Sequence, residues 1–243
     1  RCPGEFEGVA RQRPAHGHRG DGRQQPRQCA HAGQFGALHT RQQDLACAEP
    51  ADAAQRRCRQ GPHPVVILVH GGCWQKAIAD RTLMNYAAED LRTQGLAVWN
   101  IEYRGIDEDG GGYPGTFNDV ADAVAHLRLI AEKYWLDLNR VVGAGHSAGG
   151  HLVQYLGVTG DEPSLEGEGG NPQQSSRVTC VVNYYGPSDF TKSYGKSVDA
   201  HEVLPLWFGG NLETHHDLHI QGSPLYWVTP DAAGFATVTA KAT

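Results

Sequence analysis

The sequence predicts an α/β protein with a doubly wound, mostly parallel sheet. Strand-like apolar runs alternate with helix-like segments between residues 61 and 230, as in sheets whose parallel strands are joined by crossover helices. The first run, residues 65–69, is continuously aliphatic, which is typical of a strand buried on both faces. A later run ends at a serine between glycines and leads directly into an apolar helix.

The elements are expected in a regular order along the chain. Strands are predicted over residues 65–69, 96–103, 141–145 and 178–183, and helices over residues 81–93, 116–134 and 148–158. The first helix is expected to bury a side that carries Leu83, Tyr86, Ala87 and Leu91. Neither an opening hairpin before residue 61 nor a pair of strands after residue 230 is evident, so we expect an incomplete sheet.

Composition divides the chain into three regions. Residues 1–60 are expected to be disordered or non-native, residues 61–230 to form the core with a small cap at about 190–222, and residues 231–243 to form an irregular tail. The first region holds 10 Arg, no Lys and 6 acidic residues, with too few large apolar residues to offset the entropy of ordering it. It is interpreted as a disordered basic arm, a nucleic-acid-binding tail or a segment translated out of frame.

Charge, cysteine spacing and hydropathy limit the expected partners. The formal net charge is -6, which does not suggest a general nucleic-acid binder. The cysteines form no C-x-x-C pair, so we expect no metal, and Cys73 and Cys180 are predicted to be reduced, buried thiols of a cytoplasmic protein. No run approaches 18 apolar residues, so no membrane partner is expected. The sequence does not indicate the oligomeric state.

The candidate catalytic residue is Ser147, at the centre of a G-x-S-x-G pattern. A turn this tight between a strand and a helix predicts a positive φ at the serine. Gly145 and Gly149, two residues away on either side, are expected to let the backbones pass closely. The helix that follows would direct its N-terminal N–H groups at the serine, where they favour negative charge.

A second glycine-rich turn predicts an oxyanion hole. Gly71 and Gly72 follow the first strand, whose end should lie beside the end of the Ser147 strand. A serine that attacks a carbonyl creates an oxyanion, which two preorganised N–H groups can stabilise. We expect one donor to be the N–H of Ala148 and the other to come from the 71–73 turn. His70 is expected to brace this turn, and His146 and His151 to be packing residues.

These motifs together resemble the α/β-hydrolase superfamily, and within it the esterase and kynurenine-formamidase-like branch. The resemblance covers roughly residues 64–230 and rests on His70-Gly71-Gly72-Cys73-Trp74, Glu102-Tyr103-Arg104, Tyr113-Pro114-Gly115 with Asn118-Asp119, Gly145-His146-Ser147-Ala148-Gly149-Gly150, Gly186-Pro187-Ser188-Asp189 and Ser223-Pro224-Leu225. It implies a Ser-His-Asp hydrolase of small-molecule esters or arylformamides without cofactor or metal. It also implies that Ser147 is the nucleophile and that the backbone of Gly72, Cys73 and Ala148 forms the oxyanion hole, with Gly71 and Trp74 in supporting positions.

The acid and the base of such a triad are not identifiable in the sequence. Asp189, after the fourth strand, is the candidate acid, with a turn-capping role as the alternative. No base is assigned, although the remaining candidates after the serine are Asp199, Asp217, Asp231, His201, His215, His216 and His219. Activity is therefore in doubt. The second hypothesis is a non-catalytic binding remnant that uses a pocket around Trp74, Trp207 and Trp227.

Overall fold

A six-stranded sheet forms the centre of the molecule in the computed structural model, which describes residues 44–46, 62–160, 162–167, 169, 171, 173–195 and 200–239. The strand order is β1-β3-β2-β4-β5-β6, and only β1 runs antiparallel to its neighbour. The strands are β1 (Asp44–Ala46), β2 (His63–Val69), β3 (Ala97–Ile101), β4 (Leu136–His146), β5 (Cys180–Tyr184) and β6 (Gly234–Val238). The predicted doubly wound, mostly parallel sheet is confirmed.

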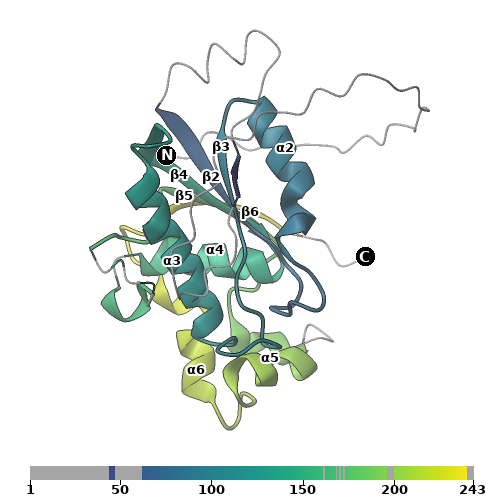
Figure 1. Cartoon of the computed structure of the whole chain (residues 1–243). Coiled ribbons are helices and arrows are strands. Elements are labelled where there is room, and N and C mark those ends of the chain that lie inside the picture. Colours follow the sequence, from purple (N-terminus) through teal and green to yellow (C-terminus); the bar gives the residue numbers. More distant parts are fainter. Residues whose placement is uncertain are drawn as a thin grey trace, which may run out of the picture.

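Helices cover both faces of this sheet (Figure 1). On one side lies α2 (Asn85–Thr93), which follows the short 3₁₀ helix η1 (Arg81–Met84). On the other side lie α3 (Gly115–Ile130) and α4 (Ala148–Thr159). Successive side chains of a strand point to opposite faces, so β2 serves both cores. Val65, Ile67 and Val69 join the larger core under α3 and α4, whereas Val66 and Leu68 join the smaller one under α2.

A helical cap lies at the ends of the strands, at the lower edge of the molecule in Figure 1. It consists of η3 (Phe190–Gly195), α5 (Ala200–Phe208), α6 (His216–Gln221) and η4 (Pro224–Trp227). A further 3₁₀ helix, η2 (Pro163–Leu165), lies in the loop after α4. The cap packs through Phe190, Leu204 and Trp207, each of which is almost completely buried.

The structure differs from the sequence-based expectations at both ends. Within the region expected to be disordered or non-native, β1 pairs with β3; the rest of residues 1–60 lies outside the described residues. Within the expected irregular tail, β6 pairs in parallel with β5. Both strands lie at sheet edges, and all five residues of β6 are exposed. Because β6 buries little, it needs no alternating apolar pattern, and the sequence therefore does not predict it.

Two smaller expectations are wrong. Of the four residues expected on the buried side of the first helix, Leu83 and Tyr86 are 55% and 89% exposed, whereas Ala87 and Leu91 pack against the smaller core beside the buried Ala88. Cys180 is disulfide-bonded and not the expected reduced thiol, whereas Cys73 forms no disulfide and is half-buried. Within the described residues, no helix is long and apolar enough to cross a membrane. The cytoplasmic location stays a prediction.

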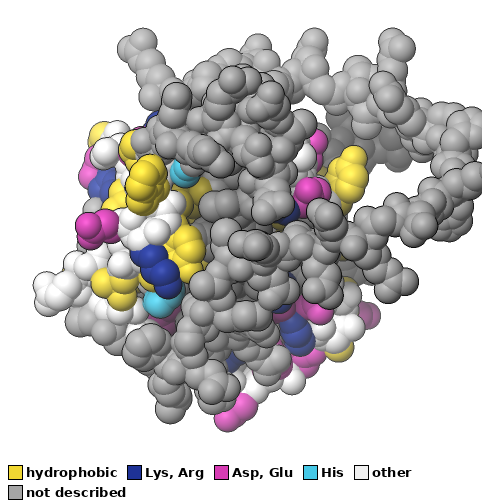
Figure 2. All heavy atoms as spheres, turned by 45° about the horizontal axis from the view of Figure 1, so that its top comes forward, with side chains coloured by type: hydrophobic (Ala, Val, Ile, Leu, Met, Phe, Trp, Pro, Cys, Tyr) yellow, Lys and Arg dark blue, Asp and Glu magenta, His cyan; other side chains and the backbone are white. Residues whose placement is uncertain are grey.

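On the face drawn in Figure 2, acidic, basic and hydrophobic side chains of the described residues are interspersed. The expectation that the chain has no nucleic-acid partner therefore stays a prediction, as does the nucleic-acid-binding interpretation of residues 1–60.

Candidate active site

Ser147 occupies a strained turn between β4 and α4. Its φ is 53° and its ψ is -122°, which confirms the predicted positive φ. The flanking glycines are needed for close backbone approach. A Cβ on Gly145 would lie 2.5 Å from the carbonyl oxygen of Gly149, and a Cβ on Gly149 would lie 2.1 Å from that of Val69. Any side chain at either position would therefore displace the strand end beneath the serine.

The turn after β2 lies beside this elbow. Val69 is paired with Gly145 in the parallel ladder, so the carboxyl ends of β2 and β4 meet at one sheet edge, as predicted. From there the backbone is left-handed at Gly72 (φ 113°), Cys73 (φ 52°) and Trp74 (φ 54°). A Cβ on Gly72 would lie 2.7 Å from the Ala79 side chain, so glycine is required there for space as well as for φ.

A pocket of about 490 Å³ opens at this point, which is within the size range of ligand sites. The β2 turn contributes Cys73 and Trp74 and the elbow contributes Ser147 and Ala148. The remaining wall comes from the segment after β5, from η3 and from α5, and consists of Tyr185, Pro187, Ser188, Asp189, Phe190, Lys192, Ser193, Ala200, Val203 and Leu204. Of the three tryptophans expected around a pocket, only Trp74 lines it. Trp207 stacks behind Trp74, and Trp227 packs on Tyr155 instead.

Ala148 lies beside Ser147 at the start of α4, and both residues line the pocket. Ala148 is the first residue of α4, so its N–H has no acceptor within the helix and lies next to the serine. The positive end of the helix dipole adds to its preference for negative charge. Cys73 reaches the same pocket from the neighbouring strand end. Ser147 and two of the three predicted oxyanion residues, Cys73 and Ala148, therefore line one cavity, whereas Gly72 is not among its lining residues.

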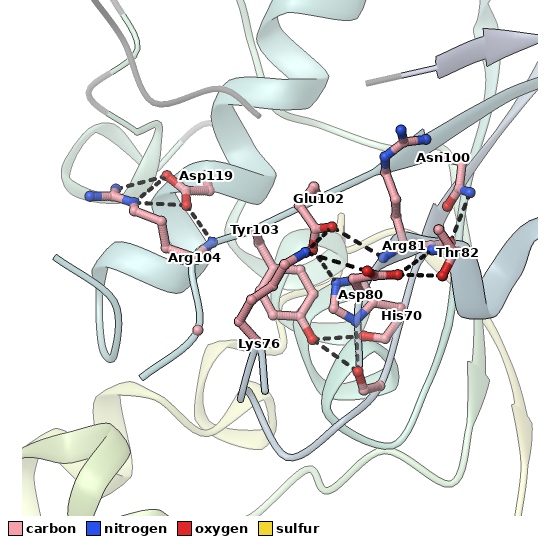
Figure 3. A network of polar contacts seen from close by, with 12 residues as sticks. His70, Lys76, Asp80, Arg81, Thr82, Asn100, Glu102, Tyr103, Arg104 and Asp119 are labelled. Atoms are coloured by element: carbon pink, nitrogen blue, oxygen red, sulfur yellow. Dashed lines mark hydrogen bonds and ion pairs between the residues drawn. The ribbon is translucent and has the colours of Figure 1, made fainter. Parts of the chain in front are cut away.

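A buried polar network lies behind the β2 turn (Figure 3). His70 Nε2 lies 2.8 Å from Glu102 Oε1, its Nδ1 lies 2.7 Å from the carbonyl oxygen of Gly71, and its ring stacks on Tyr103. Burial alone would raise the pKa of Glu102, but hydrogen bonds from His70 and Lys76 outweigh it and hold that pKa below its usual range. Glu102 therefore remains a charged acceptor at neutral pH. In the sequence, only the motif Glu102-Tyr103-Arg104 points to this carboxylate.

The contacts of Asp189 favour a cap over a catalytic acid. Its Oδ1 accepts hydrogen bonds from the backbone N–H and the hydroxyl of Thr191, at 3.0 and 2.5 Å, and its Oδ2 pairs with Lys192 at 3.1 Å. Together they outweigh desolvation and lower the pKa of this carboxyl. Asp189 does line the pocket, yet no histidine of the described residues contacts it. The capping alternative for Asp189 therefore agrees better with the structure.

The histidines of the described part of the chain do not line the pocket. His219 is buried in the cap, 2.7 Å from the hydroxyl of Tyr194, and His201 is exposed. His146 Nε2 accepts the N–H of Gly71 at 3.4 Å, at the rear of the turn. His215 and His216 lie at the start of α6, where no residue lines the pocket. The base that a serine nucleophile needs is thus unassigned.

His151 gives the stability of the protein a pH dependence. It is completely buried one turn after Ser147, and its Nε2 donates to the carbonyl oxygen of Gly222 at 2.8 Å. Burial lowers the pKa of His151 to about 4, against the opposing effect of that hydrogen bond. The unfolded chain, with a histidine pKa of about 6.5, binds more protons between these values, so stability falls as pH falls through this window.

We therefore expect the free energy of unfolding to fall by about 2 kcal/mol from this residue alone between pH 7 and pH 5. The measurement is urea denaturation at both pH values, on the wild type and on His151→Phe. The phenylalanine variant retains the aromatic packing and cannot titrate, so its pH dependence should be weaker by this amount. An equal pH dependence of the two proteins would contradict the assignment.

The doubly wound sheet and the glycine-flanked serine elbow define an α/β hydrolase. The chain belongs to the BD-FAE family, whose model matches residues 52–242. Among curated proteins, it is 31% identical to Esterase LipC of Mycobacterium tuberculosis over 182 residues, which are 73% of this chain and 43% of LipC. It is 30% identical over 135 residues to the probable carboxylic ester hydrolase LipM of the same organism, covering 54% of this chain and 30% of LipM. The chain thus spans less than half the length of these relatives.

Solved structures agree with this fold. A bifunctional GH43-CE protein of Bacteroides eggerthii superposes with a TM-score of 0.66 at 28% identity, over 72% of this chain and 26% of that one. Esterase 2 of Thermogutta terrifontis, phosphonylated by sarin, superposes with a TM-score of 0.63 at 18% identity, over 80% of this chain and 66% of that one. At 18% identity, the second likeness bears on the fold alone.

Proposed function

We propose that this chain carries the nucleophile and the oxyanion hole of a serine hydrolase that acts on carboxylic esters. The observation that carries the proposal is Ser147, held at a φ of 53° at the mouth of the pocket that Cys73 and Ala148 also line. The esterase names of the relatives LipC and LipM support the ester as the substrate class. Arylformamides share the reacting acyl carbon and stay a predicted second substrate.

In the proposed reaction, the Ser147 hydroxyl attacks the acyl carbon of the ester. The N–H groups of Ala148 and of the Gly72–Cys73 turn stabilise the tetrahedral oxyanion, and the alcohol leaves to give an acyl-serine that water hydrolyses. Trp74 and the α5 side chains form an apolar wall for the substrate, and Ser188, Asp189 and Lys192 form a polar one. The serine proton passes to a base that we do not assign among the described residues.

The direct test is labelling of the whole chain with a fluorophosphonate probe, which reacts with activated serines. We expect one adduct, on the peptide that contains Ser147, and a labelling rate at least about 100-fold lower in Ser147→Ala. Ser164→Ala, the same chemical change on an exposed serine outside the pocket, is the control and should label at the wild-type rate. Mass spectrometry separates the intended site from Ser188 and Ser193 in the same pocket. Labelling that persists in Ser147→Ala would refute the assignment.

A second candidate function is ester binding without turnover. It is favoured by one observation, that no histidine of the described residues lines the pocket. Hydrolysis of p-nitrophenyl acetate separates the two functions. Turnover that disappears in Ser147→Ala would reject the binding-only function, whereas saturable binding of the ester without turnover would favour it.

A further inference from the structure

We propose that Glu102 is a positioning residue for the oxyanion hole. Its carboxylate contacts the start, the middle and the end of the turn after β2, taken here as residues 70–81. This inference rests on the proposed function of Ser147, since it concerns the donors that would stabilise the oxyanion. Glu102 follows β3 directly, is only 6% exposed and does not line the pocket. It therefore acts through the turn and not on the substrate.

The three ties of Glu102 span the whole turn (Figure 3). At the start, Oε1 is 2.8 Å from His70 Nε2. In the middle, Oε2 pairs with the ammonium group of Lys76. At the end, the same Oε2 accepts the backbone N–H of Arg81 at 3.2 Å. One buried charge thus contacts residues that are eleven positions apart in sequence and that enclose Gly72 and Cys73.

The segment that follows Glu102 holds the same turn from outside. The Tyr103 hydroxyl donates to the carbonyl oxygen of His70 at 2.8 Å, and the N–H of Ile106 donates to that of Trp74, also at 2.8 Å. Asp107 accepts the N–H groups of Lys76 and Ala77, both at 2.7 Å. Of the two carboxylates that hold the turn, Asp107 is exposed, whereas Glu102 is buried.

The turn needs such support because its backbone is strained. Three consecutive residues, Gly72 to Trp74, have positive φ, and two of them carry side chains. Non-glycine residues keep this conformation only when their surroundings enforce it. Relaxation would move the N–H groups of Gly72 and Cys73 out of the positions in which, by the proposed function, they stabilise the oxyanion. An oxyanion donor acts only in the transition state, so its loss lowers kcat and leaves the KM nearly unchanged.

Two substitutions separate the shape of Glu102 from its charge. Glu102→Ala removes all three ties, and we expect the rate of fluorophosphonate labelling and the kcat for p-nitrophenyl acetate to fall about 100-fold, with the KM within about threefold of the wild type. Glu102→Gln retains the shape. The amide oxygen can accept from Lys76 and Arg81, and its NH₂ can donate to His70 Nε2 while Nδ1–H donates to Gly71. We expect this variant to remain within about fivefold of the wild type.

The matched control is Asp119→Ala. Asp119 is a carboxylate of similar burial, 9% exposed, that pairs with Arg104 two residues after Glu102 and makes no contact with the turn in Figure 3. We expect Asp119→Ala to lose stability but to retain the labelling rate within about threefold. An equal fall in Asp119→Ala and Glu102→Ala, or a wild-type rate in Glu102→Ala, would overturn the proposal.

Two further measurements cover the remaining outcomes. If Glu102→Ala does not fold, Lys76→Met removes only the middle contact and should reduce the labelling rate about tenfold; a wild-type rate would overturn the proposal.

If the wild type does not label at Ser147, the proposed function fails, and amide hydrogen exchange then tests the positioning role by itself. Exchange over residues 72–78 should rise at least about tenfold in Glu102→Ala and not in Asp119→Ala. Unchanged exchange in Glu102→Ala would overturn the positioning role.

Discussion

Replacement of Gly149 with alanine is expected to abolish the native elbow and to reduce the free energy of unfolding by at least about 4 kcal/mol. The added Cβ would lie 2.1 Å from the carbonyl oxygen of Val69 and 2.4 Å from that of His70. Both contacts are with backbone, so no side-chain rotation relieves them. Either the end of β2 or the start of α4 must move, and these two segments form the two sides of the candidate active site.

Gly143→Ala is the control for this substitution. Gly143 lies on the same strand, β4, and its added Cβ would meet the Val153 side chain at 3.4 Å, close to ordinary contact. We expect Gly143→Ala to change the free energy of unfolding by less than about 1 kcal/mol. Soluble yield and urea denaturation of both variants are the measurements. A Gly149→Ala protein as stable as Gly143→Ala would show that the elbow tolerates a side chain there.

The central strands and the elbow were predictable because their signals are local. The apolar run of β2 is almost completely buried. The glycines around Ser147 are required because a Cβ at either position would clash with backbone atoms. A strand that is buried on both faces consists of a continuous run of apolar residues, and such a run is evident in the sequence. The exposed edge strand β6 is stabilised by backbone pairing with β5 instead, and pairing leaves no residue pattern.

The partly exposed helix α2 shows the limit of periodicity. Leu83 and Tyr86 contribute to the apolar side of the predicted helix. The helical segment begins, however, as the 3₁₀ helix η1, whose tighter winding rotates Leu83 away from the position expected in an α-helix. The small Ala88 is buried against β2 and β3, with Met84, Ala87 and Leu91 packed around it. A change of helix type within a few residues alters which side of the helix is buried, although the number of apolar residues in the segment stays the same.

The supporting residues of the site were not predictable for a different reason. Glu102 approaches His70 across 32 positions of sequence, and this contact exists only because β3 pairs with β2. The pocket wall from η3 and α5 likewise depends on how the cap folds back over the strand ends. Sequence spacing does not encode such contacts, whereas the two glycine turns require only the register of β2 and β4.

Trp207→Ala is expected to reduce the free energy of unfolding by about 3–5 kcal/mol, because it would leave a large cavity between the cap and the core. Trp207 is 1% exposed and stacks on Trp74 with ring centroids 5.1 Å apart. It also packs edge-on against His151 at 5.1 Å, so it joins α5 both to the β2 turn and to α4, the helix that follows Ser147. Loss of this ring would loosen the α5 wall of the pocket together with Trp74.

The chemistry of the indole ring sharpens this prediction. Trp207 Nε1 is buried without a hydrogen-bond partner among the described residues, so the ring contributes packing and not a polar contact. Trp207→Phe should therefore recover most of the loss and remain within about 2 kcal/mol of the wild type. Leu206→Ala, on the 65% exposed neighbour, should change stability by less than about 0.5 kcal/mol. Equal free energies of unfolding of Trp207→Ala and Leu206→Ala in urea denaturation would contradict this prediction. The cap would then not depend on this ring, and Phe190 and Leu204 would hold the pocket wall.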